Sequence, residues 1–578
     1  MAPTDQLQEV KIMLHGTAAS EGIGIGKVML IEEHSLEYTP RTVTDTEAES
    51  QRFKAAVDAF CYNTEKQAEN LRSSAGEKEA EILAGHIQII KDPYLSGEIE
   101  KLIADGQCAE SALEHMCDMF IAMFSAADDE LTKQRAADVR DIKSGVLGIL
   151  LGVNEIKVSD APKGTVLVAR ELTPSVTAGI VKENIAGIIA ETGGTTSLCA
   201  MLARALEIPA VLSVDGVASS LKNGDTVVVD GSEGAVIVNP DDNTVSEYSK
   251  KRDAFLAERK ELENYRGRET KSASGEVYEL FCNIGKPEDA VKAVDADGEG
   301  VGLFRTEFLF MDRTSIPTED EQFEAYKKAA LILKGKSLII RTLDIGGDKD
   351  IPYLGLEKEE NPFMGFRAIR YCLKNRELFK SQIKAILRAS AFGDVKIMFP
   401  LITTMDELRE GKKLVAECKA DLRNMDINFN ENIQVGVMVE TASAAVIADM
   451  LAKEADFFSI GTNDLTGYTM ACDRGNNDVS YLYSPLQPSV LRMIKRTIEC
   501  GVQNGISVGM CGEAAANKLM IPLLISFGLT EFSVSAPSVL NVRKIISTWT
   551  KEEADKVTAK VLEMSTQQEI VEYLKSVV

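Results

Sequence analysis

Residues 433–464, IQVGVMVETASAAVIADMLAKEADFFSIGTND, decide the fold of the larger part of the chain. They hold two apolar runs, IQVGVMVE and DFFSIGTND, separated by ASAAVIADMLAKEA, whose apolar residues recur at helical spacing. Short, continuous apolar runs are typical of strands buried on both faces, as in a parallel sheet. The stretch therefore predicts a strand, a crossover helix and a second, parallel strand.

The same alternation extends in both directions from this stretch. The other apolar runs are, in order, YELFCNI, GVGLFR, SLIIRTLD, VKIMFPL, ISVGMCGE and EFSVSA, with helical stretches such as QFEAYKKAALIL between them. Eight buried strands that alternate with helices are the signature of a (β/α)8 barrel. We therefore expect residues 271–578 to form such a barrel.

The first part of the chain predicts a multidomain α/β protein. Residues 1–40 and 156–245 contain strand-like runs such as GTVLVAR, IAGIIAE and DTVVVDG, with one strong helix at 198–207, and predict a compact α/β domain. Within it, IMLHGTAASEGIGIGKVMLI is expected to form two strands around a glycine-rich turn. Its G-x-G-x-G leads into a strand and not into a helix, so it is not a dinucleotide-binding motif.

Two further segments complete the predicted organisation. Residues 41–155 change to helical periodicity, with Phe53, Ala56 and Phe60 on one face, and predict a helical domain inserted into the α/β domain. Residues 246–270 are too polar to form a core and predict a linker helix with Glu and Lys supporting one another.

Composition narrows the class of protein. Of the 578 residues, 45% are hydrophobic and 26% charged, as in a globular protein, and the formal net charge of −25 argues against a nucleic-acid surface. The ten cysteines are scattered, with no C-x-x-C pair, which favours a reducing cytoplasm. No stretch has the length of a membrane span. We expect a cytoplasmic protein without membrane insertion.

Polar residues gather where the predicted barrel strands end, which is the catalytic face of such barrels. They are Arg305 and Glu307, Arg341 and Asp344 followed by Lys349, Glu440, Asn463 and Asp464, and Cys511 and Glu513, with Arg367 and Arg474 in the loops that follow. Arginine binds phosphate and carboxylate in two-point geometry. The alternative is that these residues form surface salt bridges. It would require charged residues to stand at so many strand ends by chance. We therefore predict a small substrate that carries both phosphate and carboxylate.

Glu440 and Asp464 are hard oxygen donors, the ligands that octahedral Mg²⁺ prefers in proteins. The sequence therefore predicts a magnesium site formed by these two carboxylates. Cys511 has two interpretations: a thiol that donates a proton or acts as a nucleophile, or a buried and inert packing residue.

The stretch GGTTSLCAML, residues 193–202, carries two glycines and three hydroxyl residues before an apolar helical pattern. A helix entrance of this kind suits an incoming phosphate. The residue at the entrance is Leu198, whose side chain offers no lone pair.

At this point the chain resembles a known family. VGLFRTEFLFMDR, RTLDIGGDK, ENPFMGFRAIR, VGVMVET, DFFSIGTNDLTGYT and GMCGE closely resemble enzyme I of the bacterial sugar phosphotransferase system, the phosphoenolpyruvate–protein phosphotransferases. AGHIQIIKDP, RAADVRDI, LTPSVTAG and ARALEIPAV extend the resemblance, in order, over nearly the entire chain.

The resemblance implies a relay of phosphoryl groups. Phosphoenolpyruvate would bind at the barrel and phosphorylate a histidine on a swivelling α/β domain, which passes the group to the phosphocarrier HPr docked on the helical domain. Cys511 would protonate the enolate carbon as pyruvate forms, and the family is dimeric through the barrel. Glu440 and Asp464 would bind Mg²⁺, and substrate contacts would come from Arg305, Arg341, Asn463, Asp464 and Arg474, with Lys349 and Arg367 as lesser contacts.

Two features of the helical domain bear on the partner. The acidic residues Glu77, Glu79 and Glu81 are expected to steer a basic patch on HPr. His86 lies next to them and is expected to be a structural, hydrogen-bonded histidine.

The chain departs from the family where the phosphoryl group should be received. The family motif reads Gly-Gly-x-Thr-Ser-His, and Leu198 stands here in place of the phospho-accepting histidine. Imidazole has a lone pair near neutral pH, whereas leucine has none. No other residue is a convincing substitute: Cys199 is adjacent, at a helix N-terminus that could lower the pKa of its thiol, but it lies about 100° further around the helix. We expect substrate and Mg²⁺ to bind while phosphoryl transfer fails.

Three origins of Leu198 fit the sequence equally: an engineered variant, a natural divergent copy, and a sequence error. Two other functions compete with this interpretation. One is a non-catalytic regulator that binds phosphoenolpyruvate or HPr. The other is a phosphoenolpyruvate synthase or pyruvate phosphate dikinase, which the absence of a P-loop and of a large nucleotide-binding domain disfavours.

Overall fold

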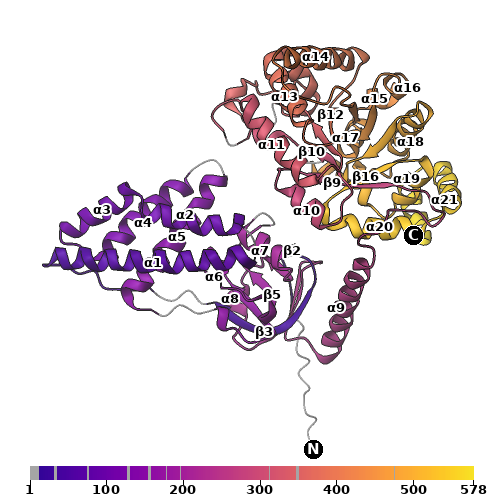
Figure 1. The fold of residues 1–578 in the computed structure, drawn as a ribbon. Helices are drawn as coiled ribbons and strands as arrows, with labels where there is room; N and C mark the ends of the chain where they lie inside the picture. The colour runs from indigo at the N-terminus through magenta and orange to yellow at the C-terminus, as the bar shows by residue number, and fades with distance from the viewer. Residues whose placement is uncertain are drawn as a thin grey trace, which may run out of the picture. The chain divides into compact units, whose positions relative to one another are not determined.

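The computed structural model of the chain forms two compact units, Met1–Arg259 and Lys260–Val578 (Figure 1). It describes residues 12–31, 36–74, 77–126, 130–153, 158–177, 179–194, 197–311, 313–346, 351–473 and 476–578.

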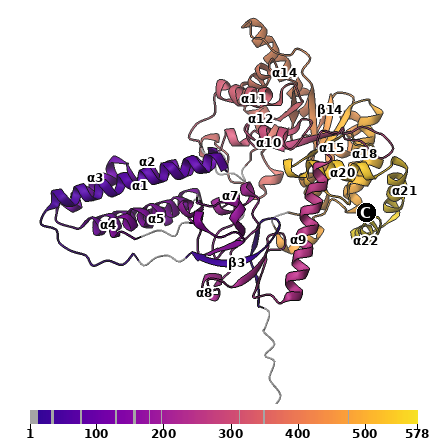
Figure 2. The same cartoon turned by 60° about the horizontal axis from the view of Figure 1, so that its bottom comes forward.

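The first unit contains a bundle of long helices. They are α1 (Thr46–Ser74), α2 (Glu77–Ile90), α3 (Pro93–Ala104), α4 (Ala109–Ser125) and α5 (Glu130–Leu151). Helix α3 shows how the sequence sets a boundary: the Asp92 carboxylate accepts the backbone N–H of Tyr94 and Leu95, and Pro93 occupies the first turn, where no N–H is needed. The pairs α1–α2 and α4–α5 lie side by side (Figure 2), around a core that includes Phe53, Phe60 and Leu113.

An eight-stranded sheet forms the rest of the first unit, in the order β1-β8-β7-β3-β4-β5-β6-β2. Its strands are β1 (Ile12–His15), β2 (Thr17–Ser20), β3 (Ile23–Ile31), β4 (Thr165–Ala169), β5 (Ile185–Ala190), β6 (Ala210–Leu212), β7 (Thr226–Asp230) and β8 (Ala235–Val238). Strands β3 to β6 are parallel, and the other pairs are antiparallel.

The predicted two strands over residues 12–31 are three in the structure. The chain divides at Gly16, because β1 pairs with β8 and β2 pairs with β6 at the opposite edge of the sheet. A Cβ atom on Gly16 would lie 2.4 Å from the carbonyl oxygen of Leu212, so the crossing between the two edges requires glycine.

Short helices connect these strands, and one long helix follows them. They are α6 (Pro174–Thr177), α7 (Leu198–Leu206), α8 (Val217–Ser220) and α9 (Asp242–Glu263), with 3₁₀ turns at Val158–Asp160 and Lys182–Asn184. Helix α9 is the charged helix that the sequence predicted as a linker.

The second unit is a closed barrel of eight parallel strands, as predicted. The strands are β9 (Glu279–Ile284), β10 (Val301–Phe304), β11 (Leu338–Arg341), β12 (Val395–Phe399), β13 (Val435–Val439), β14 (Phe457–Ile460), β15 (Ser507–Met510) and β16 (Glu531–Val534). The multidomain α/β class and the C-terminal barrel are therefore confirmed.

Helices surround the barrel (Figure 1). They are α10 (Asp289–Asp295), α11 (Glu319–Leu333), α12 (Ala368–Lys374), α13 (Arg376–Ala389), α14 (Met405–Asn424), α15 (Ala442–Val446), α16 (Ala448–Leu451), α17 (Thr462–Met470), α18 (Pro488–Gln503), α19 (Ile521–Phe527), α20 (Val539–Thr548), α21 (Lys551–Glu563) and α22 (Gln567–Val577). Short 3₁₀ turns occupy Glu307–Leu309, Pro352–Leu354, Pro362–Met364, Asn477–Leu482, Glu513–Ala516 and Ala536–Ser538.

Inside the barrel lies a small apolar layer, distinct from the large core. It consists of Leu303, Ile339, Met398, Met438, Phe457 and Cys511. The large core lies between the strands and the helices. A barrel interior filled in this way holds the strand ends, and the side chains on them, in fixed positions.

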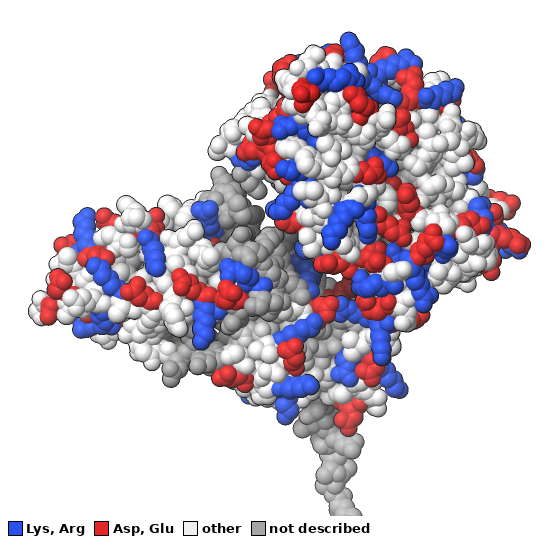
Figure 3. Space-filling model, in the orientation of Figure 1, with Lys and Arg blue, Asp and Glu red and all other residues white. Residues whose placement is uncertain are grey.

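Charged side chains of both signs are interspersed over the face seen in Figure 3. Among the described residues, no helix combines the length and the apolar character needed to cross a membrane.

Candidate active site at the carboxyl end of the barrel

Arg341, the last residue of β11, lies at the centre of the site. Its Nη2 donates to Glu307 Oε1 at 2.9 Å, and its Nη1 lies 2.9 Å from Asp344 Oδ2. Burial lowers the pKa of this guanidinium, but the charges of the surrounding carboxylates outweigh that effect and raise it. Arg341 is therefore a permanent positive charge in a buried setting.

Arg367 reaches the same group of carboxylates from the start of α12. Its Nε and Nη2 donate to Asp344 Oδ1 at 3.0 and 2.7 Å, and its Nη2 lies 3.5 Å from Asp464 Oδ2. Nη1 of Arg367 and Nε of Arg341 are buried and have no hydrogen-bond partner in the described part of the chain. Buried donors that stay unpaired are costly, so these two N–H groups indicate that a ligand supplies the acceptor oxygens.

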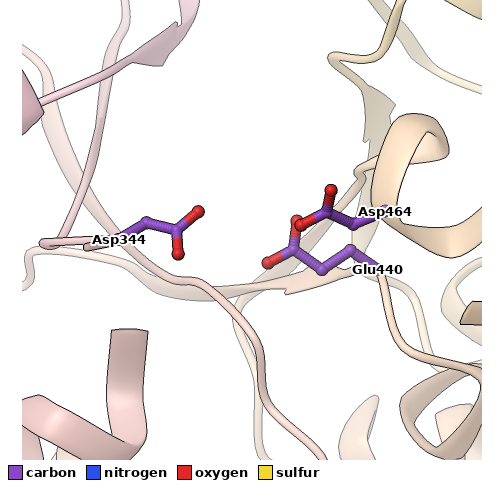
Figure 4. A group of neighbouring side chains, drawn as sticks. All are labelled: Asp344, Glu440 and Asp464. Atoms are coloured by element: carbon purple, nitrogen blue, oxygen red, sulfur yellow. The ribbon is translucent and has the colours of Figure 1, made fainter. Parts of the chain in front are cut away.

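Three carboxylates, Asp344, Glu440 and Asp464, converge beside these arginines (Figure 4). One oxygen from each lies within 4.8 Å of the others, close enough to share a cation. Glu440 is held by the backbone N–H of Leu401, which donates to its Oε1 at 2.7 Å. Glu440 and Asp464 were predicted as metal ligands, whereas Asp344 was recognised only as a polar strand end.

The three carboxylates differ in electrostatic setting. Burial, followed by the negative charges of Asp464 and Asp344, raises the pKa of Glu440 well above its usual range. Burial also acts to raise the pKa of Asp344, but Arg341 and Arg367 outweigh it and lower that pKa. Arg341 and Arg367 act to lower the pKa of Glu440 but do not outweigh burial and the two carboxylates, and a divalent cation would add the missing positive charge.

Cys511 lies just beyond β15, in the apolar layer inside the barrel, and is 3% exposed. Its Sγ donates to the backbone oxygen of Ile460 at 3.8 Å. Burial raises the pKa of the Cys511 thiol to about 11, so the thiol stays protonated near neutral pH. A buried neutral thiol suits a proton donor better than a thiolate nucleophile.

A buried polar network fixes the two strand ends that carry the site. The side-chain amide of Gln382, on α13, donates to Thr306 Oγ1 at 3.1 Å and accepts the Leu343 N–H at 2.9 Å. Thr306 in turn donates to the backbone oxygen of Arg341 at 2.9 Å. Sequence reasoning missed Gln382, because a lone glutamine on a helix carries no pattern.

The other predicted residues are placed as follows. Arg305 follows β10 and has an exposed side chain, and Asn463 lies in the first turn of α17, where its backbone oxygen accepts from the Tyr483 hydroxyl at 2.9 Å. Glu513 begins a 3₁₀ turn and is exposed. Lys349 and Arg474 lie outside the described residues.

The stretch 193–202 forms the entrance to α7, in the first unit. Helix α7 begins at Leu198, and the Ser197 hydroxyl caps it by accepting the Ala200 N–H at 3.2 Å. Gly193 has a φ of +108°, a conformation that favours glycine. Thr195, Thr196 and the side chain of Leu198 lie outside the described residues.

Cys199 is buried next to this entrance, 6% exposed, and burial raises the pKa of its thiol to about 12. It stays protonated and packs in the core of the sheet, which argues against a phosphocysteine.

In the helical bundle, His86 is 1% exposed, and its Nε2 lies 3.3 Å from Asp138 Oδ1 on α5. This placement confirms the expected hydrogen-bonded helix histidine. The side chains of Glu77, Glu79 and Glu81 lie outside the described residues.

The closed barrel carries an arginine pair and a carboxylate group at one end. The class of protein is that of the phosphoenolpyruvate-utilising enzymes, because the models of that family match most of the chain. The PEP-binding domain model covers residues 259–550, the mobile domain model 161–234 and the N-terminal model 15–135.

The chain belongs to the phosphoenolpyruvate-protein phosphotransferase family, enzyme I. It is 46% identical to the member from Bacillus subtilis over 98% of this chain and 99% of the relative. It is 44% identical to the Priestia megaterium member, over 97% and 98%. Among solved structures, an NMR structure of an Enzyme I protein aligns with 42% of this chain and 99% of its own, at 36% identity and a TM-score of 0.38.

Proposed function

We propose that this chain is a phosphoenolpyruvate-dependent protein phosphotransferase in its architecture and in its substrate site, and that it is inactive in phosphoryl transfer as written. The proposal is carried by one buried N–H group each on Arg341 and Arg367 that has no hydrogen-bond partner among the described residues, next to three carboxylates. The relatives' shared name supplies the substrate, phosphoenolpyruvate.

The residues divide the work of binding. Arg305, Arg341, Asn463, Asp464 and Arg474 hold the phosphate and carboxylate of phosphoenolpyruvate, with Lys349 and Arg367 as lesser contacts. Glu440 and Asp464 would hold Mg²⁺, which, when bound, neutralises charge on the phosphoryl group and the enolate. Cys511 donates its thiol proton to the enolate carbon, so that pyruvate forms.

The receiving side of the reaction lies at position 198. A histidine there would take the phosphoryl group at the capped entrance of α7, whose helix dipole favours the incoming negative charge. Leu198 has no lone pair to offer. The chain as written therefore binds phosphoenolpyruvate and Mg²⁺ without becoming phosphorylated.

The proposal extends to the place of the reaction in the cell. Residues 1–40 and 156–245 act as the swivelling domain, 41–155 as the docking domain for HPr, 246–270 as the linker helix, and 271–578 as the substrate barrel. The protein acts as a cytoplasmic homodimer joined through the barrel. The resemblance to the family supports each of these statements.

The second candidate is a non-catalytic relative that binds phosphoenolpyruvate or HPr as a regulator. The observation that favours it is Leu198 itself. This second candidate predicts that the chain has lost further catalytic groups besides the imidazole at position 198.

Incubation with ³²P-labelled phosphoenolpyruvate and Mg²⁺ separates the two. We expect no label on the chain as written and stoichiometric label on the Leu198→His variant. A Leu198→His variant that takes up no label would favour the regulator, and label on Cys199 of the unaltered chain would refute the proposed inactivity. The Leu198→Gln variant is the control for a polar side chain that is a poor phosphoryl acceptor.

A further inference from the structure

The barrel interior contains a buried carboxyl group that the proposed mechanism does not use. Glu531, the first residue of β16, is 5% exposed, and its Oε1 has no hydrogen-bond partner in the part of the chain that the structure describes. An unpaired buried carboxyl costs stability and calls for an explanation. It lies at the amino end of the strands, opposite the arginines and the carboxylate group.

Glycines make room for this carboxyl group. A Cβ atom on Gly302 would lie 2.4 Å from Glu531 Oε1, and one on Gly509 would lie 2.8 Å from it. Any side chain at either position would displace the carboxyl. The two glycines therefore leave room for an acid in the barrel interior. Alanine or valine at these positions would have filled the same space.

Strand register connects Glu531 to the thiol. Glu531 pairs with Gly509 on β15, and Gly509 pairs with Ser459 on β14, so these positions point into the barrel in one layer. Cys511 is two residues beyond Gly509 and points the same way, one layer nearer the substrate. Because the Glu531 carboxyl lies over Gly509, its separation from Ser459 on the next strand is one strand spacing, ~4.8 Å.

Ser459 completes the connection. Ser459 is 1% exposed, and its hydroxyl has no hydrogen-bond partner within the described residues. Its register partner Gly509 stands two residues before Cys511, and Ser459 lowers the pKa of the Cys511 thiol. A hydroxyl can donate and accept at once, and one water can bridge a gap of a strand spacing. Glu531, Ser459 and Cys511 thus form a polar path through the barrel interior, beside the pair in which the Ser533 hydroxyl donates to Asn283 Oδ1 at 2.7 Å.

We propose that Glu531 is the proton reservoir that restores the Cys511 thiol after each turnover, through Ser459. This inference rests on the proposed role of Cys511 as the proton donor. Glu531 is thus a second acid in the reaction. It acts through Cys511 and does not touch the substrate.

The proton balance is as follows. The Cys511 S–H bond breaks, the proton becomes a hydrogen on the enolate carbon of the forming pyruvate, and sulfur keeps the electron pair. Ser459 then gives its proton to the thiolate and takes the proton of Glu531. The Glu531 carboxylate recovers a proton from hydronium or a buffer acid in the solvent at the amino end of the barrel, where Glu279 is exposed.

The charges around Glu531 suit a reservoir. Burial has the largest effect and raises the pKa of the Glu531 carboxyl to about 8. Glu279, its register partner on β9, also raises this pKa, whereas Lys396 on β12 lowers it. Gly509 on the neighbouring strand β15 and Gly302 on β10 add no side chain beside the carboxyl, and the Ser533 side chain lies next to Gly302 as well. The carboxyl is loaded with a proton at neutral pH and close enough to neutrality to release it.

Isotope trapping tests the path in the Leu198→His chain. The protein in H₂O is mixed with D₂O for a variable time, phosphoenolpyruvate and Mg²⁺ are added, and the pyruvate of the first turnover is analysed for deuterium in its methyl group. We expect the parent to deliver deuterium after the shortest mixing time. In Glu531→Gln the pyruvate methyl group should instead receive protium after short mixing times, because the Cys511 thiol exchanges its proton at least about tenfold more slowly.

Glu279→Gln is the matched comparison, because it removes a charge beside Glu531 but leaves the Glu531 carboxyl in place. Its exchange should stay much closer to the parent's than that of Glu531→Gln. Equal exchange in Glu531→Gln and the parent would overturn the reservoir and show that solvent reaches the thiol from the substrate end. A Leu198→His parent that forms no pyruvate would instead refute the proposed function. The amount of first-turnover pyruvate reports the folded, active fraction of each variant.

Discussion

The side-chain amide of Gln382 donates to the hydroxyl of Thr306 at 3.1 Å, and by this bond a helix outside the barrel holds the end of β10. The carbonyl oxygen of the same amide accepts the Leu343 N–H at 2.9 Å, just beyond β11. Arg305 and Glu307 flank the first contact, and Arg341 and Asp344 flank the second. One buried glutamine therefore sets the spacing between two parts of the candidate site.

Gln382→Met should weaken both the barrel and its substrate site. The substitution preserves the volume but leaves the buried Leu343 N–H without its acceptor and removes the donor to the Thr306 oxygen, which still donates to the Arg341 backbone oxygen. The expected cost is about 3 kcal/mol in the free energy of unfolding. Phosphoenolpyruvate affinity should fall because Arg341 loses its fixed position. Denaturant unfolding and calorimetric titration measure the two effects. Gln568→Met, at an exposed position on α22, is the control and should change neither.

The three carboxylates should contribute unequally to metal binding. The Asp344 oxygens are engaged by Arg341 and Arg367, whereas Glu440 has a raised pKa and only one backbone donor to its Oε1. Glu440→Gln should therefore lower Mn²⁺ affinity by about tenfold or more. Asp344→Asn should cost mainly stability, because it leaves buried arginines uncompensated. Paramagnetic titration with Mn²⁺ checks the order, and an equal loss in both variants would contradict it.

Much of the fold was predictable because the signals are local. The apolar runs at 433–440 and 456–464 and the helical spacing between them predict a parallel unit, and its eightfold repetition predicts closure. The division of residues 12–31 into three strands was not predicted. It depends on which distant strand each segment pairs with, and on the close approach of Gly16 to Leu212.

The candidate site was predictable only where residues stand at strand ends. Glu440, Asp464 and Arg341 could be found there, because the carboxyl ends of parallel strands meet at one face. Gln382 and Ser459 act through contacts between elements far apart in the sequence, and neither residue type has a distinguishing pattern. Glu531 reads in sequence as an ordinary charged residue before a strand, and only the closed barrel buries it.

Ser197→Ala should destabilise the entrance of α7. The Ser197 hydroxyl is the side-chain cap of this helix, and its removal leaves the Ala200 N–H without an acceptor, which costs about 1 kcal/mol. Amide hydrogen exchange in residues 199–202 should accelerate accordingly, while the barrel is unaffected. Ser197→Asp retains an acceptor and should restore protection. Unchanged exchange in Ser197→Ala would show that the cap does not stabilise the helix.

Glu531→Gln should stabilise the barrel increasingly as the pH rises from about 5 to 8. In the unfolded chain this carboxyl ionises near its ordinary value of 4.5, whereas burial holds its pKa at about 8 in the folded barrel. Between these values the folded state binds a proton that the unfolded state has lost, so the Glu531 contribution to stability falls with rising pH, by about 1.4 kcal/mol per unit. Above pH 8 both states are ionised and the contribution levels off. Unfolding of the parent and the variant at several pH values measures the difference. A difference that stays constant from pH 5 to 8 would mean that Glu531 is ionised in the folded barrel, and it would then have no proton to give to Cys511.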